Sequence, residues 1–512
     1  MEEFQKWITK SKNTKKGHEL AFCQLCHCDI TAHKTDLVRH SKSEKHILNE
    51  RQVASNEKVK NITFFSEDDS VKRAEIKLAA FLAIGYSSDT TNVMFGDNHS
   101  VYTLLKQDLP YIVCIKCSCH LIHLAASKAC LSLPRSVEDT LRNIGAHFSR
   151  SPARQEKLKE IQTFFKYDIH KILLPAATRW LSLCQCVDRV LEQLECLIAY
   201  FRVESLTDPS RTTENILNIL LNPITKLYLE FMSYVLGLLT DFNKLFQSES
   251  PLLYKLKYET ESLLKTILLN FMKKEFVINA HIFNLNHKNP HYFCTLEDIY
   301  LGLAATQTLQ DLKQTLPKEE ISSFLKNCLS FYIELSTEIK NRFVFTDPIF
   351  EIIDILDPLM AQCFKIKSLS SVTSKFPFLK QYIDCQKLDN EWRQHGLMDH
   401  KLYNLDPLKS AAEYWNDVMN LKNAAGIKLF SNLEVVIQFL LVLPFSNAPC
   451  ERIFSDLNNI KTDKRNNMVS STITALLHTK QGIKESDGVI KFEPSPEMLR
   501  INVSRKTKHP ET

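Results

Sequence analysis

A chain of 512 residues with 44% hydrophobic and 24% charged residues has the composition of a soluble globular protein, and its length favours several folded units. Only 10 residues are glycine, which predicts few tight turns and a helix-rich fold, and the net charge of +5 is mild. The lysine-rich start argues against a signal peptide, and the lack of a long apolar stretch argues against a transmembrane helix. Of the 15 cysteines, three cluster near the start and the other twelve are scattered, which does not suggest a disulfide framework.

The first predicted unit, residues 1–50, is a small zinc-binding domain. Its sequence Cys23-x2-Cys26-x13-His40-x5-His46 places two thiols and two imidazoles at the spacing of a structural zinc site. Binding of Zn²⁺ would contribute about 10–16 kcal/mol, which is enough to fold a unit too short to build its own core.

Basic residues are concentrated around this site. Residues 1–60 contain 12 Lys and Arg against 8 Asp and Glu, so most of the net positive charge lies there. A local basic surface can follow the phosphates of a nucleic acid, and a merely solvated, charged segment is the alternative. Cys28 and His33 are further candidate ligands, but neither keeps the spacing of the zinc site.

Residues 51–83 are predicted to be a linker and a helix, and residues 84–130 a short α/β segment. In the second of these, a strand near Gly85 leads to a turn at Asp89, and a β-branched run over residues 111–117 predicts another strand. A helix is predicted to begin near His120, beside cysteines that suggest either packing, which we favour, or a second zinc site.

A long helical region is predicted over residues 131–425. Ser136 and Asp139 form a capping-box sequence, and Ser151-Pro152 and Asp406-Pro407 are predicted to begin helices. Apolar residues at helical spacing predict two core-facing stripes. These stripes are Leu227, Phe231, Tyr234, Leu238 and Phe242, and then Leu296, Ile299, Tyr300 and Leu303.

Residues 426–470 are densely apolar. Their first helix is apolar over too wide a face for a surface helix, so either the rest of the chain or a second copy must cover it. A second helix follows, with Ile453 and Leu457 one turn apart. Residues 471–512 are polar, contain prolines and are predicted to be disordered.

Several stretches resemble, in family order, motifs of the hAT superfamily of DNA transposases that carry an N-terminal BED-type zinc finger. Phe4 and Trp7 precede the zinc ligands as the BED aromatic residues do. The longest match is Ser446–Ser455, which resembles the C-terminal hAT signature. The other matches are Ser87–Gly96 (second catalytic aspartate), Lys116–Leu124 (Cys-x-x-His element) and Thr178–Trp180 (Thr-Arg-Trp element).

The resemblance implies a multidomain, mainly α fold. It consists of a Cys2His2 zinc finger, a ribonuclease-H-like α/β part interrupted by an all-α insertion, and a C-terminal hAT helical segment. Members of the family cleave DNA with three carboxylates that hold two metal ions. Asp89 would be the second aspartate and Glu451 the glutamate. The segment with the first strands and first aspartate is absent between Ala83 and Ile84, so we expect a truncated remnant without catalytic activity.

The resemblance also implies a nuclear, zinc-dependent homodimer that binds DNA and no membrane. The candidates for DNA contacts are Lys34, Arg39, Lys42, Lys45 and Trp180, of which Trp180 is equally well explained as a core residue. The candidates for the dimer interface are Leu433, Val436, Ile437, Leu440, Leu441, Ile453 and Leu457. The alternatives are an active or trans-complemented transposase or nuclease, and a protein-interaction scaffold that has lost DNA binding.

Overall fold

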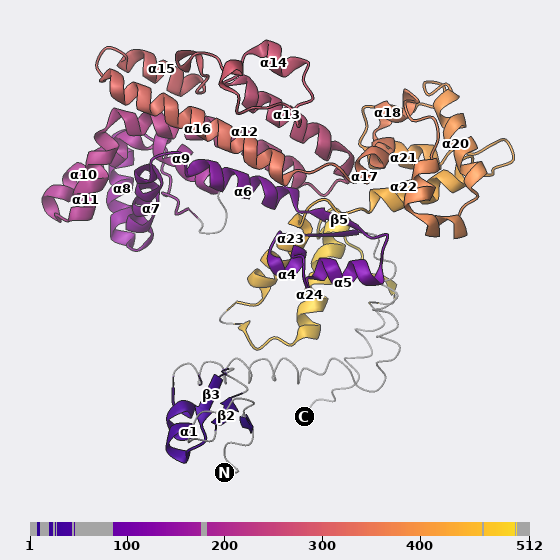
Figure 1. Cartoon of the computed structure of the whole chain (residues 1–512), viewed down its shortest axis with the longest axis horizontal. Coiled ribbons are helices and arrows are strands. Elements are labelled where there is room, and N and C mark those ends of the chain that lie inside the picture. Colours follow the sequence, from indigo (N-terminus) through magenta and orange to yellow (C-terminus); the bar gives the residue numbers. More distant parts are fainter. Residues whose placement is uncertain are drawn as a thin grey trace. The chain divides into compact units, whose positions relative to one another are not determined.

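The computed structural model describes residues 8–10, 20–23, 26, 28–43, 46, 85–175, 182–462, 465–496 and 498. The chain divides into two compact units, Met1–Leu82 and Ala83–Thr512, which are described separately (Figure 1). The described residues are mainly helical, as predicted, and their strands form two small sheets. No helix among these residues is long and apolar enough to cross a bilayer.

The described residues of the first unit form an antiparallel sheet followed by helix α1 (Lys34–Ser41). The strands of the sheet are β1 (Ile8–Lys10), β2 (Leu20–Cys23) and β3 (Cys28–Thr31). Strand β2 pairs with both neighbours, and Cys23 lies opposite Cys28 in the hairpin. Acidic Asp36 lies in the first turn of α1 and basic Arg39 in the last, which suits the helix dipole.

The second unit begins with two parallel strands joined by a helical crossover. These elements are β4 (Gly85–Ser88), α4 (Asn92–Phe95), α5 (Val101–Asp108) and β5 (Val113–Lys116). A crossover is required because a tight hairpin can join only antiparallel strands. The Ser100 side chain caps α5 by accepting from the Thr103 amide, and Val113 and Ile115 of β5 are buried.

A distant segment of the chain lies against these strands. A Cβ atom at Gly85 would lie 2.2 Å from Cδ of Pro444, so only glycine allows this close approach. Phe445, the next residue, packs edge-on against Phe246, with ring centroids 6.1 Å apart. The short sheet is therefore covered by residues that follow it by more than 300 positions.

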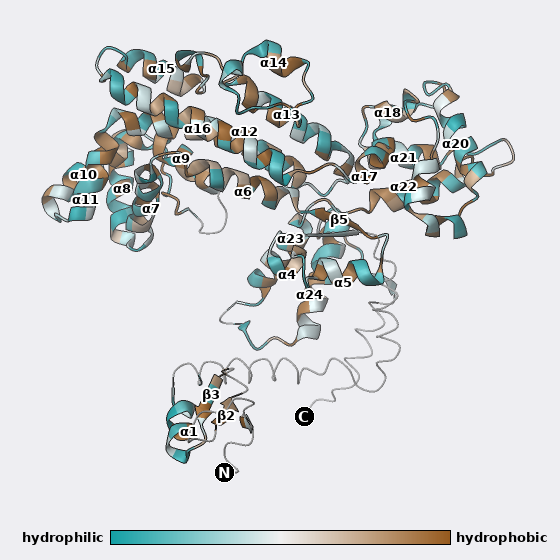
Figure 2. Cartoon of the chain, in the orientation of Figure 1, coloured by the Kyte–Doolittle hydropathy of each residue, from teal (hydrophilic) through white to brown (hydrophobic). Residues whose placement is uncertain are grey.

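A helical bundle forms the largest part of the second unit. Helix α6 packs along α16, and α12 packs on α6, α9 and α15, so α12 lies in the middle of the core. The predicted stripe of α12 is confirmed, with Leu227 and Phe231 fully buried; Figure 2 shows the hydrophobic residues along this helix. The bundle comprises α6 (Ser118–Cys130), α7 (Arg135–Ser149), α8 (Pro152–Phe164), α9 (Ser182–Glu192), α10 (Leu194–Thr207), α11 (Arg211–Leu221), α12 (Pro223–Phe246), α13 (Leu256–Leu269), α14 (Lys274–Ile278), α15 (Leu303–Leu312) and α16 (Lys318–Arg342).

A second group of helices packs around an aromatic cluster. The indole N–H of Trp392 donates to the Ile366 carbonyl at 2.8 Å, and that of Trp415 donates to the Leu356 carbonyl at 3.0 Å. Each indole is therefore buried with its polar atom paired. The helices are α17 (Ile349–Ile352), α18 (Pro358–Gln362), α19 (Ser370–Lys375), α20 (Cys385–Leu397), α21 (Ala411–Met419) and α22 (Ser431–Leu441).

The last two helices pack on each other and correct one prediction. They are α23 (Ala448–Ile460) and α24 (Ser470–Glu485). The prediction of disorder from residue 471 is therefore wrong for residues 471–485. Ile473 of α24 is buried, and Lys480 forms an ion pair with Asp456 of α23, so a mostly polar sequence still gains one packed face.

Three predicted helix starts have different outcomes. Ser151 caps α8 with Pro152 in the first turn, as predicted. Ser136 instead lies inside α7, whose N-cap is Pro134, because the helix begins before the capping-box sequence. Asp406 accepts from the Leu408 amide in a turn, and the following helix begins only at Ala411.

The second predicted stripe, from Leu296 to Leu303, does not form one helix. Residues Leu296–Asp298 form a 3-10 turn, and Gly302 has a φ of +90°, which ends any regular helix before α15 begins. Ile299 is buried, but Tyr300 is 44% and Leu303 68% exposed, so the prediction of a core-facing helical stripe is wrong here for the helix and for two of its four residues.

Three buried histidines make the second unit sensitive to acid. Burial lowers the pKa of His147 and of His287 to about 4, and that of His395 to about 3. An unfolded histidine has a pKa of about 6.5, so the unfolded chain binds protons first as the pH falls. The stabilising effect of the neutral rings is thus complete above about pH 6.5 and is lost as the pH falls toward about 4.

We expect His395→Phe to reduce the pH dependence of unfolding. Each histidine contributes a slope of up to about 1.4 kcal/mol per pH unit in this window, so removal of one should flatten the combined slope by about a third. Loss of the His395 hydrogen bond to Tyr414 lowers stability at every pH but leaves the slope readable. Urea unfolding followed by circular dichroism measures the slope. His478→Phe, at an exposed site on α24, is the control, and an unchanged slope in His395→Phe would contradict the assignment.

Candidate metal centre

The hairpin of the first unit positions two thiols. Cys23 is the last residue of β2, and Cys26 lies in the turn that leads to β3. The Cys26 backbone amide donates to Sγ of Cys23 at 3.4 Å, which folds the turn around the sulfur. Both cysteines are buried, whereas most of the short hairpin is half-buried or exposed.

Helix α1 and the turn after it position two imidazoles. His40 lies in the last turn of α1, whose end is marked by a hydrogen bond from the Ser43 amide to the His40 carbonyl. The Ser43 hydroxyl then accepts from the His46 amide at 3.3 Å, so this turn holds His46 back toward the hairpin. The rings of the two histidines lie edge to face, with centroids 4.8 Å apart.

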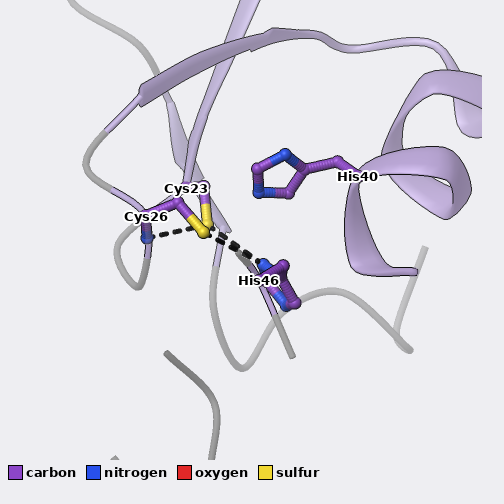
Figure 3. A group of neighbouring side chains, drawn as sticks. All are labelled: Cys23, Cys26, His40 and His46. Carbon is purple, nitrogen blue, oxygen red and sulfur yellow. Dashed lines mark hydrogen bonds between the residues drawn. The ribbon is translucent and has the colours of Figure 1, made fainter. Parts of the chain in front are cut away.

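The four side chains converge on one point, as Figure 3 shows. Their ligand atoms all lie within 4.8 Å of one another. Nδ1 of His46 is 3.6 Å from Sγ of Cys23 and 3.6 Å from Sγ of Cys26. Among the described residues this is the only group of three or more His, Cys, Asp or Glu side chains close enough to hold one ion. The predicted ligands Cys23, Cys26, His40 and His46 are therefore brought together and can bind a metal ion.

The two additional candidate ligands do not join the cluster. Cys28 stands on β3, opposite Cys23 in the hairpin register. His33 precedes α1, and its Nδ1 lies 2.7 Å from the Thr35 hydroxyl. The spacing in the sequence thus distinguishes the four residues that converge from the nearby Cys28 and His33, which do not.

The predicted DNA-contacting residues that the structure describes are exposed. Lys34, Arg39 and Lys42 lie on or directly after α1 with side chains open to solvent. Arg39 forms only a weak surface ion pair with Asp36, at 3.5 Å. Lys45 and Trp180 lie outside the described residues.

In the second unit, the two predicted catalytic remnants both act electrostatically on one histidine. His120 of α6 is half-buried, and burial lowers its pKa, while both Asp89 and Glu451 oppose this by attraction. Asp89 accepts hydrogen bonds from the amide and hydroxyl of Thr91, so it organises the turn before α4. Glu451 lies in the first turn of α23. Residues 362 positions apart in sequence therefore share one neighbourhood, but they form no three-ligand metal cluster with His120.

Two motif segments also meet, which the sequence interpretation did not anticipate. The amide and hydroxyl of Ser118 both donate to the Phe445 carbonyl, at 3.4 and 3.1 Å. The Asn447 amide donates to Sγ of Cys117 at 3.2 Å. Only the shared resemblance of the two segments to one family could have indicated this contact.

The predicted dimer residues divide into buried and exposed ones. Helix α22 packs against α20 and α21, so the chain itself covers the apolar face of this helix. Leu433, Val436, Ile437 and Leu440 are buried there, and Leu441 is half-buried. On α23, Leu457 is half-buried and Ile453 is 55% exposed. Phe454, which the sequence interpretation missed, is 63% exposed beside it.

Comparison of the chain with models of known protein families gives no match, and comparison with curated proteins gives none either. The resemblance to hAT transposases therefore depends on the motifs alone.

We expect the full-length protein to bind one metal ion per chain at this centre. Cys26→Ser should lower the affinity by more than about 100-fold, because loss of even an outer partner of a metal ligand costs about 10- to 100-fold. Chelation should unfold the first unit and leave the second folded, since the second has its own large core. Elemental analysis gives the stoichiometry, and amide hydrogen exchange reports each unit separately.

Cys28→Ser is the matched control, because it removes a neighbouring thiol that lies outside the cluster. It should keep one ion per chain. Wild-type affinity in Cys26→Ser would show that the four side chains do not form the site.

Proposed function

We propose that this protein is a nuclear, zinc-dependent DNA-binding protein that acts as a homodimer, derives from a hAT-like transposase and has no transposition activity. The observation that carries the proposal is the convergence of Cys23, Cys26, His40 and His46 beneath a helix with exposed basic residues.

The distances between the ligand atoms favour zinc. Tetrahedral Zn²⁺ with Zn–S bonds of about 2.3 Å and Zn–N bonds of about 2.0–2.1 Å places sulfur and nitrogen about 3.5 Å apart. The two measured distances from His46 Nδ1 to the sulfurs are both 3.6 Å. A set of two thiolates and two imidazoles is also the soft-to-borderline donor set that zinc prefers over Mg²⁺ or Ca²⁺.

Zinc would supply the cohesion that the first unit lacks. Among its described residues the buried apolar ones are Ala21, Cys23, Cys26 and Leu37, and two of these four are candidate metal ligands. So small a core cannot offset the conformational entropy lost on folding, which metal binding can. The orientation of α1, and with it any DNA contact, would then depend on the metal.

The exposed basic residues of α1 support DNA as the partner. Lys34, Arg39 and Lys42 present their charges to solvent, and a weak surface ion pair such as that of Arg39 is readily exchanged for a phosphate. Lys45 and Trp180 remain candidates on the resemblance alone.

The exposed pair on α23 supports a homodimer interface that is narrower than the predicted one. Adjacent large apolar side chains on a surface are typical of interaction sites. Ile453 and Phe454 form such a pair, whereas Leu440 and its neighbours on α22 are already covered by the chain. Dimerisation would place two finger units on one DNA duplex and raise the apparent affinity through effective concentration.

The local roles of Asp89 and Glu451 support the proposed lack of catalysis. Asp89 is engaged by Thr91, and Glu451 lies at the positive end of the α23 dipole, so each has a structural role without metal. A two-metal site needs a third carboxylate, for which the sequence supplies no counterpart.

We expect Lys34→Gln, Arg39→Gln and Lys42→Gln together to weaken DNA binding and its dependence on salt. Each lost phosphate contact should reduce the slope of log affinity against log salt concentration by about 0.9, so the triple variant should lose up to about 2.7. Fluorescence anisotropy with a labelled duplex over a salt series measures both quantities.

The control triple variant removes the same charge from exposed residues of the second unit: Lys313→Gln, Lys318→Gln and Lys326→Gln. Equal losses in both triples would refute a finger-centred DNA interface, and no binding by the wild type would favour the scaffold alternative. DNA cleavage with Mg²⁺ that disappears in Asp89→Asn would favour the enzyme alternative.

We expect Ile453→Asp with Phe454→Asp to convert the dimer to a monomer. Both side chains are exposed, so the fold should persist, and removal of a central apolar contact worth about 2 kcal/mol raises the dissociation constant about 30-fold or more. Sedimentation velocity measures the change. Leu408→Asp, at an 83% exposed apolar site away from α23, should stay dimeric. A monomeric wild type, or a folded and dimeric double variant, would refute the interface.

A further inference from the structure

Two cysteines at the start of α6 are close in sequence and face the same distant segment. Cys117 is the N-cap residue of α6, and Cys119 is in its first turn. Their side chains are only 1% and 6% exposed, and the Cys119 thiol is the largest influence on the pKa of Cys117. In a regular helix residues two apart point to opposite sides, but Cys117 is the N-cap residue and has non-helical backbone angles, which allow its side chain a different direction.

The same two thiols bind a distant segment of the chain. Sγ of Cys117 accepts from the Asn447 amide at 3.2 Å. Sγ of Cys119 lies 3.8 Å from the Asn243 carbonyl oxygen and 3.9 Å from the Ser446 hydroxyl oxygen, and its single proton can be donated to either. The two sulfurs therefore help to hold residues 446–447, directly before α23, against the start of α6 and the end of α12.

The surroundings lower the pKa of one thiol and raise the pKa of the other. The hydrogen bond from Cys119 lowers the pKa of the Cys117 thiol, with a further contribution from the Asn447 amide. The same contact raises the pKa of Cys119, as does burial. Cys117 is thus the sulfur that ionises first, and Cys119 is the one that keeps its proton. These are the protonation states expected of an attacking and a resolving cysteine, respectively.

The backbone spacing permits a bond between them. Residues two apart at a helix start have Cα atoms about 5.4 Å apart, from the rise and radius of the helix. This value lies inside the range of about 4.4–6.8 Å found in disulfides. Both thiols already face residues 446–447, so closure needs a rotation of side chains and no large movement of the backbone.

We propose that Cys117 and Cys119 form a redox-modification site, at which hydrogen peroxide generates a Cys117–Cys119 disulfide and thereby releases residues 446–447 from the start of α6.

The reaction balances with peroxide as the only oxidant. The Cys117 thiolate attacks one oxygen of the peroxide; an S–O bond forms, the O–O bond breaks, and the departing hydroxide takes up the proton released by Cys117. The Cys119 sulfur then attacks the sulfenic acid sulfur; the S–S bond forms, the S–O bond breaks, and hydroxide leaves with the Cys119 proton as water. Two thiols lose two electrons, and one peroxide becomes two waters. Peroxide is small enough to reach sulfurs that bulky oxidants cannot.

Oxidation removes the hydrogen bonds that hold the segment. The disulfide has no S–H to donate to Asn243 and Ser446, and its sulfur is a much weaker acceptor than a thiolate for the Asn447 amide. The hydrogen bonds of Ser118 to Phe445 remain, so the release is confined to the residues just before α23.

The experiment treats the full-length protein with hydrogen peroxide, denatures it, labels free thiols with N-ethylmaleimide and analyses tryptic peptides. We expect the peptide of residues 117–128 to lack label, to be lighter by two hydrogens and to regain two labels after reduction. Amide exchange across residues 445–450 should accelerate at least about tenfold after oxidation, because loss of a capping-strength contact is worth about 1.4 kcal/mol.

The chain contains a matched control pair. Cys184 and Cys186 of α9 have the same spacing, but they lie within the helix, and burial raises the pKa of each to about 11. Their peptide should keep two labels under the same treatment. Cys119→Ser should give no disulfide, should trap Cys117 as a sulfenic acid that reacts with dimedone, and should show slow amide exchange with or without peroxide.

Three outcomes would overturn the proposal. The first is a peptide of residues 117–128 that keeps both labels while the exposed Cys363 and Cys385 are oxidised. The second is a disulfide that joins either sulfur to another cysteine. The third is a Cys117–Cys119 disulfide that leaves amide exchange at residues 445–450 unchanged, which would refute the release of the segment. All readouts lie in the second unit and are independent of DNA binding by the first.

Discussion

Two parallel strands cannot bury their own faces, and this constraint organises the second unit. A sheet normally needs three or more strands, or packing against helices, to be stable. Strands β4 and β5 are the only two that the described part of this unit contains. They are completed instead by the segment before α23, which approaches through the space left by Gly85 and is held by the hydrogen bonds of Ser118 and Cys117. The helical bundle lies between these segments in sequence, so its fold must bring the two segments together.

The folds of the two units are stabilised in different ways. The first gathers four ligands where an ordinary domain would have a core, so its stability would depend on an ion from outside the chain. The second buries a continuous set of apolar residues over many helices and contains buried histidines whose neutral form it requires. Metal supply and pH would therefore act on different parts of one polypeptide.

The sequence could predict the features that depend on local pattern or on fixed chemistry. The ligand spacing identified the metal cluster, because four convergent side chains leave little freedom in the positions of their ligands. The β-branched run identified β5, and Ser151-Pro152 identified the start of α8. Prediction failed where a partner far along the chain decides the outcome. The apolar face of α22 was expected to be available to a second copy, but α20, about 40 residues earlier, covers it. The pattern of apolar residues within 429–468 cannot show which distant helix covers α22. It does not show that Phe454 is exposed either.

The separation of 330 residues between Cys117 and Asn447 has a consequence for synthesis of the protein. Ribosomes extend a chain at about 5–20 residues per second, so roughly 15–65 s pass between the emergence of β5 and that of its covering segment. During this interval the bundle can assemble from contacts between neighbouring helices. The apolar atoms of the two strands and the edge of their sheet stay exposed to solvent until the covering segment is made. Chaperones that bind nascent chains would find a target at β4 and β5 throughout this interval, and ribosomal pausing within the bundle would lengthen that exposure.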